Sequence, residues 1–242
     1  MKKYISVFSL IAKNSIYQIA GLMLLLVAAD GALAWYWICV RGNSLSNLFR
    51  NGNGGFGLVL AVIFALIAVA QLRRGDIYSG PQGYTMQRLA ISETAVAALQ
   101  IFYNLLCWLI LWGVQVLSVF AICKLCCRYG AGGVLANQQI FLQFYISPLL
   151  HSLLPMEEAL LWAANAAMIA ELSVASACWT VLRRGKEGTA KMLVLYWAAI
   201  LLFRRELGSF IWNVLLIAGF SILLVMDCYK LFWRKKEEAD YA

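Results

Sequence analysis

Charged side chains are scarce in this sequence. Asp, Glu, Lys and Arg together make up 13% of its 242 residues, whereas a soluble globular domain carries about 25%. Hydrophobic residues make up 63% and the mean hydropathy is +0.76. Apolar segments of about 20 residues recur along the chain, the length that crosses a hydrocarbon core of ~30 Å as a helix. The composition therefore excludes an ordinary soluble domain and predicts an all-α, multi-pass membrane protein.

The residue patterns of common enzymes are also missing. A single histidine, His151, excludes an HExxH motif and any multi-histidine metal site. The glycine cluster at residues 52–57 lacks the Lys and Ser or Thr of a phosphate-binding loop, and no GxSxG occurs. The seven cysteines are scattered, which is not a disulfide framework. We therefore expect no catalytic residue, no metal and no cofactor bound by this chain.

Six apolar segments are expected to span the membrane as a single transmembrane domain. They are residues 19–40, 58–72, 95–123, 159–182, 192–203 and 209–229, followed by a cytoplasmic tail at 230–242. Residues 137–154 are apolar but contain Pro148 and end before Pro155, so we expect an interfacial or re-entrant helix there and not a seventh span.

Residues 1–18 are too polar for a span and have helical periodicity. Their polar positions lie on one helix face and the apolar positions on the opposite face: Lys2, Ser6, Ser9 and Lys13 against Tyr4, Val7, Phe8 and Ile11. This pattern predicts an amphipathic helix lying in the membrane interface. The alternative is an ordinary basic flank of the first span.

The distribution of basic residues predicts the orientation. Of the 20 Lys and Arg residues, 14 lie in the N-terminal segment, in the connections after spans two and four, and in the tail. Because cytoplasmic segments are enriched in Lys and Arg, both termini are expected in the cytoplasm. The net charge of +8 then reflects contact with anionic lipid of the plasma membrane and not a nucleic-acid partner.

Two carboxylates are expected near mid-membrane, Asp30 in the first span and Glu171 in the fourth. Placing a carboxylate there costs about 2.5–3.5 kcal/mol on insertion scales, so such residues usually face protein or a water-filled cavity. They could contact a cation or substrate or relay a proton, or they could be protonated acids bonded to a neighbouring helix. The third span adds a polar line of Gln100, Asn104 and Gln115, which predicts contact with another helix or an aqueous path. We assign these five residues to a substrate pathway.

Two connections on the predicted cytoplasmic side begin with Arg-Arg-Gly, at residues 73–75 and 183–185. In the first, a GPQG turn precedes a short amphipathic segment. The length of this connection favours docking to another protein, with a bland connector as the alternative.

The layout and the segment GYTMQRLAIS, residues 83–92, resemble the permease subunits of type-2 ABC transporters. The resemblance implies a coupling helix held in a cleft of a separate ATPase, which would bind ATP and Mg²⁺. This helix would comprise Tyr84, Thr85, Met86, Gln87, Arg88 and Leu89, with a minor contact from Arg183, Arg184 and Lys186. A second permease copy or a homologous permease would pair along spans one and five. One departure is that the large external segment lies between spans three and four, where the family usually has it between five and six.

The leading hypothesis is thus the permease subunit of an ATP-driven exporter of a peptide, lipid-like or drug-like substrate. The rival is a proton- or ion-coupled secondary transporter with a 3+3 inverted repeat, because Asp30 and Glu171 fall in the first span of each half. A non-transporting membrane scaffold is the third possibility.

Overall fold

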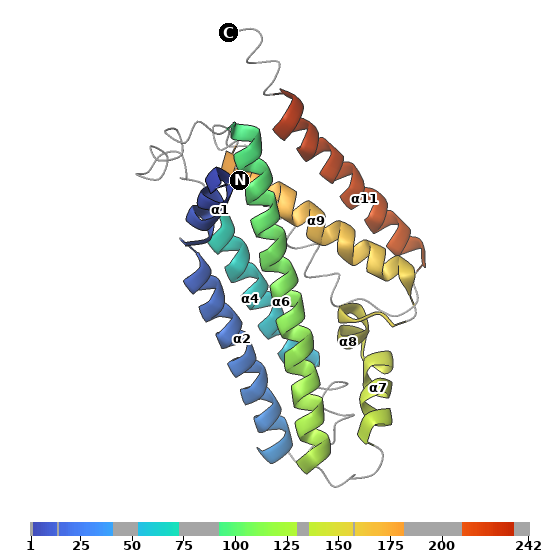
Figure 1. Ribbon diagram of the computed structural model, residues 1–242. Coiled ribbons are helices and arrows are strands. Elements are labelled where there is room, and N and C mark those ends of the chain that lie inside the picture. Colours follow the sequence, from blue (N-terminus) through green and yellow to red (C-terminus); the bar gives the residue numbers. More distant parts are fainter. Residues whose placement is uncertain are drawn as a thin grey trace.

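The computed structural model describes residues 2–13, 15–40, 53–72, 92–129, 136–156, 158–181 and 210–234. Every regular element in these ranges is helical, which confirms the all-α prediction (Figure 1). The elements are α1 Lys2–Lys13, α2 Ile16–Trp35, η1 Tyr36–Val40, α4 Asn53–Leu72, α6 Glu93–Tyr129, α7 Ala136–Ile146, α8 Pro148–Leu153, α9 Ala159–Val181, α11 Phe210–Tyr229 and η3 Lys230–Arg234.

Four of the described helical segments are long and apolar enough to cross a membrane: Ile16–Val40, Thr94–Cys126, Ala159–Thr180 and Phe210–Trp233. They correspond to predicted spans one, three, four and six. The second predicted span coincides with α4, whose apolar part, Gly55–Gln71, is shorter. The fifth, residues 192–203, lies outside the described residues.

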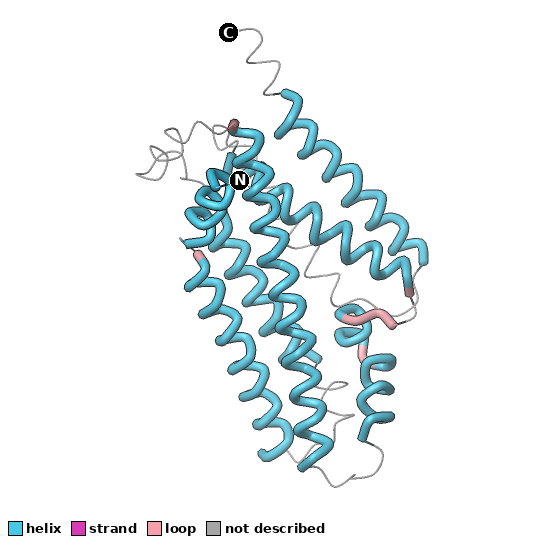
Figure 2. The backbone as a smooth tube through the Cα atoms, in the orientation of Figure 1, coloured by secondary structure: helices cyan, strands magenta, loops and turns pink. Residues whose placement is uncertain are grey.

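Helices α2, α4 and α6 alternate in direction and lie side by side along the length of the bundle (Figure 2). Helix α9 packs on α6, and α11 packs on the far side of α9. Helices α9 and α11 run in the same direction, so the end of α9 and the start of α11 lie at opposite ends of this pair. As a result α1, the ends of α4, α9 and α11, and the start of α6 all lie toward one end of the bundle (Figure 1).

The predicted elements differ from the structure in three details. The N-terminal helix ends at Lys13, and residues 16–18 begin the first long helix, because Ser15 forms the junction between the two. The third span continues as helix beyond residue 123 to Tyr129, since neither Gly nor Pro interrupts it. Residues 137–154 form two helices and not one, because Pro148 cannot continue a helix that arrives from α7.

Helix α1 is fixed to the bundle by its apolar face. Val7 and Ile11 are buried in the main core, and the ring of Phe8 lies 6.0 Å from that of Tyr103 on α6. At the junction, the hydroxyl groups of Ser15 and Tyr103 form a 2.7 Å hydrogen bond. Ser6, Ser9 and Lys13 are exposed on the opposite face. The predicted apolar face is confirmed for Val7, Phe8 and Ile11, which contact protein, but not for Tyr4, which is exposed.

Exposed aromatic side chains mark both ends of α2 and α11. On α2 these are Tyr17 and Trp35, 18 residues apart. On the last helical segment they are Trp212 of α11 and Trp233 of η3, which follows α11 directly, 21 residues apart. At 1.5 Å per residue the separations are about 27 and 32 Å. Both match a hydrocarbon core of ~30 Å flanked by aromatic belts. The outer surface of the bundle is therefore shaped for lipid.

Candidate functional site

The polar residues predicted to line a pathway fall into three groups at different places in the bundle. The first is centred on Asp30, which is 0% exposed on α2. The Ser118 hydroxyl donates a 2.9 Å hydrogen bond to Asp30 Oδ2 and also lies 3.0 Å from the carbonyl oxygen of Gln115. Asp30 is thus joined to α6, as the prediction of contact between spans requires.

Gln115 lies beside the Asp30 carboxyl group and is 1% exposed. The Gln115 amide is close enough to act on the carboxyl group as a donor, but no hydrogen bond of ordinary geometry joins the two, and Asp30 Oδ1 also has no such partner among the described residues. Buried polar groups are almost always hydrogen-bonded, so the Gln115 amide and Asp30 Oδ1 mark a polar site that the described protein groups leave incomplete.

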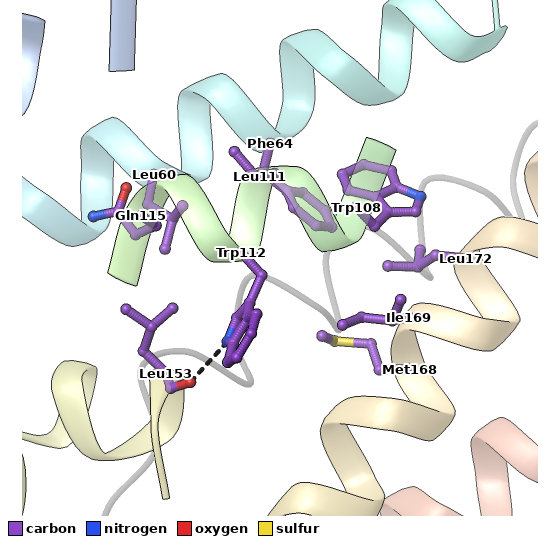
Figure 3. A pocket seen from close by; sticks show the side chains of 10 residues that line it. All are labelled: Leu60, Phe64, Trp108, Leu111, Trp112, Gln115, Leu153, Met168, Ile169 and Leu172. Carbon is purple, nitrogen blue, oxygen red and sulfur yellow. Dashed lines mark hydrogen bonds between the residues drawn. The ribbon is translucent and has the colours of Figure 1, made fainter. Parts of the chain in front are cut away.

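A cavity of about 30 Å³ adjoins this site, between α4, α6, α8 and α9. Gln115 lines one end of it, and the remaining wall is apolar and aromatic (Figure 3): Leu60, Phe64, Trp108, Leu111, Trp112, Leu153, Met168, Ile169 and Leu172. This volume holds about two water molecules. It is too small for a peptide or a drug-sized molecule in this conformation.

The second group joins α6 to α9. The Gln100 amide donates to Asn104 Oδ1 at 3.3 Å, and the Asn104 amide donates to the Ser176 hydroxyl at 2.8 Å. All three side chains are buried. Two residues of the predicted polar line, Gln100 and Asn104, thus take part in a hydrogen-bonded contact between α6 and α9. The sequence alone did not identify α9 as the partner helix.

Glu171, the second predicted carboxylate, belongs to neither group. It is 0% exposed on α9 and lies within electrostatic range of Cys228 on α11. The structure therefore does not bring Asp30 and Glu171 together. The other predicted site residues, Tyr84 to Leu89 and Arg183, Arg184 and Lys186, lie outside the described residues.

Sequence reasoning missed a set of donors that holds α8 inside the bundle. The indole N–H of Trp112 donates to the Leu153 carbonyl at 2.8 Å, that of Trp162 donates to the Pro155 carbonyl, and the Asn165 amide donates to the Ser152 carbonyl at 2.9 Å. A helix end leaves carbonyl groups unpaired, and in lipid these need a partner within the protein. Pro148 and Pro155 in an apolar segment were the signal, because proline has no N–H group to donate to a preceding carbonyl group. The indole N–H of a tryptophan can donate to such a carbonyl group instead.

The α8 helix is almost wholly enclosed as a result. Leu149, Leu150 and Leu153 are buried, and so is His151, whose Nε2 lies 3.9 Å from Glu158 Oε1 just before α9. This arrangement is a short helix packed into the bundle.

Comparisons with protein-family models, curated proteins and solved structures find no match to this chain.

Proposed function

We propose that this chain is the membrane-spanning permease subunit of an ATP-driven exporter, with ATP and Mg²⁺ bound by a separate ATPase subunit. One observation carries the proposal. The elements that border the two Arg-Arg-Gly connections, namely the end of α4, the start of α6 and the end of α9, converge at the end of the bundle where α1 lies (Figure 1). Both connections therefore start from one place, as joint docking of a single soluble partner requires.

The direction of the helices supports six crossings with both termini in the cytoplasm. Helices α9 and α11 run in parallel and pack against each other, so the chain between them has to return along the bundle. A return through residues 192–203 would make the fifth crossing. Residues on the outer face of α2, including Leu24, Leu25 and Val27, are exposed, and this face is available to lipid or to a second permease.

The test is purification in mild detergent followed by transport assays, with residues 84–89 replaced by a Gly-Ser segment of equal length. We expect the wild-type chain to co-purify with an ATP-hydrolysing protein and the variant to lose both this partner and ATP-driven transport. Replacing residues 43–48, on the predicted external side, by the same segment is the matched control and should retain both. Unchanged ATP-driven transport in the 84–89 variant would contradict the assignment.

A secondary transporter built as an inverted repeat is favoured by a different observation. Asp30, in the first span of one half, bonds to Ser118 on α6, while Glu171, in the first span of the other half, lies within electrostatic range of Cys228 on α11. Each carboxylate thus lies near the third span of its own half, α6 for Asp30 and α11 for Glu171. Two halves related as repeats would place their carboxylates in this equivalent way. Transport in liposomes that requires a proton or ion gradient and no nucleotide would establish this alternative in place of the exporter.

A further inference from the structure

The incomplete polar site around Asp30 has the chemistry of a cation ligand set. Asp30 lies 14 residues from the start of α2 and ten from the end of η1, so it is about 21 and 15 Å from the two ends of this segment. No ion pair to its carboxyl group occurs among the described residues. Ionisation of Asp30 without a counter-ion would cost several kcal/mol, so an occupant that supplies positive charge, a cation or a proton, would stabilise the site.

Three kinds of oxygen atom are available there. Asp30 Oδ1 and Gln115 Oε1 have no hydrogen-bond partner in the described part of the chain, and the Ser118 hydroxyl keeps its lone pairs because its hydrogen is directed to Asp30 Oδ2 or the Gln115 carbonyl. Oxygen ligands of this kind suit hard cations. One carboxylate is too few for Ca²⁺ or Mg²⁺, which take six or more oxygen ligands, usually including several carboxylates or waters.

The size of the neighbouring space restricts the occupant further. The adjoining cavity of about 30 Å³ can hold one or two species of the size of water. Gln115 lines it, and the same side chain lies beside the Asp30 carboxyl group. Water could fill this space, but water would not supply the positive charge that an ionised Asp30 requires.

We propose that Asp30, Gln115 and Ser118 form a binding site for one small monovalent cation, such as sodium, potassium or ammonium, at the α2–α6 interface. The inference rests on insertion of the chain into a membrane and is independent of a partner ATPase. It therefore survives or fails separately from the proposed exporter function.

The experiment is a cation titration of the purified full-length chain in detergent at constant pH and ionic strength. Choline, which is too large for the cavity, is the reference ion and is replaced stepwise by sodium, potassium or ammonium. We expect at least one of the small cations to raise Tm by about 5–10 °C at 100 times its Kd, with saturation. Asp30→Asn should abolish this rise, whereas Glu171→Gln, which neutralises an equally buried carboxylate on α9, should keep it.

The Gln115→Leu variant provides a second test, which remains valid even if the Asp30→Asn variant does not fold. Loss of one oxygen ligand to a charged group should raise the half-saturating cation concentration by at least about 10-fold. An unchanged half-saturating concentration in Gln115→Leu, or an equal Tm in choline and in all three small cations for the wild type, would overturn the proposal. A Tm that follows pH but not the cation would assign the site to a proton and would overturn it as well.

Discussion

Replacement of Trp108 by alanine is expected to lower the free energy of unfolding of the bundle by about 2–3 kcal/mol. Trp108 is 2% exposed on α6, and its ring centroid lies 4.5 Å from that of Phe64 on α4. It also lines the existing cavity, so the deleted side chain would leave a space continuous with a void that is already present.

The size of this effect follows from the membrane setting. In lipid, a side chain remains in hydrocarbon when the helices separate, so the transfer component of a core substitution is small and packing determines the result. At about 24 cal/mol per Å³, a new cavity on the order of 100 Å³ gives the stated range.

The matched control for Trp108→Ala is Leu109→Ala, at the next position on α6, which is 43% exposed. It should change the free energy by less than about 0.5 kcal/mol, as surface substitutions usually do. Denaturant titration of the purified variants in the same detergent measures both. Equal effects of the two substitutions would contradict the packing of α4 against α6.

The second large effect is expected from Phe144→Ala, which should destabilise the docking of α7 and α8 by about 2 kcal/mol through the same cavity term. Phe144 is 0% exposed and stacks on Phe120 of α6, with ring centroids 4.7 Å apart and an interplanar angle of 23°. It shares a buried cluster with Phe56 of α4 and Leu150 of α8.

Phe141 lies one helical turn away on α7 and is 55% exposed, so Phe141→Ala is the control for Phe144→Ala. The two variants remove the same kind of side chain from one helix, at an exposed and at a buried position. Denaturant titration should show a clear loss of stability in the Phe144 variant only. Similar losses in both would mean that α7 lies on the membrane surface and does not pack against the bundle.

The lengths of the apolar segments allowed most of the described helices to be predicted. The first, third, fourth and sixth predicted spans coincide with described helices, and Pro148 marks the break between α7 and α8. The prediction was least accurate at the ends of helices, where Ser15 and the residues after Cys123 carry no strong signal. A polar, proline-free stretch such as Lys124–Tyr129 is compatible with both helix and loop.

The partners of the buried polar residues could not be predicted from periodicity. Asn104 and Ser118 lie on one face of α6, but Asn104 bonds to Ser176 of α9 and Ser118 bonds to Asp30 of α2. Because neighbouring helices cross α6 at an angle, the same face meets different helices at different heights. These partners are 72 and 88 residues apart in sequence, and only the tertiary packing brings them together.

We propose that the chain crosses the membrane repeatedly, with the end of the bundle near α1 in the cytoplasm. Single cysteines in a background without the seven native ones test it, with a membrane-impermeant maleimide applied to intact cells. With this orientation, we expect labelling of Ser44→Cys and Gly132→Cys in intact cells. Labelling of Ser79→Cys and Gly188→Cys is expected only after the cells are opened. The reverse pattern, or equal labelling of all four positions in intact cells, would contradict the orientation and with it the docking of a cytoplasmic ATPase.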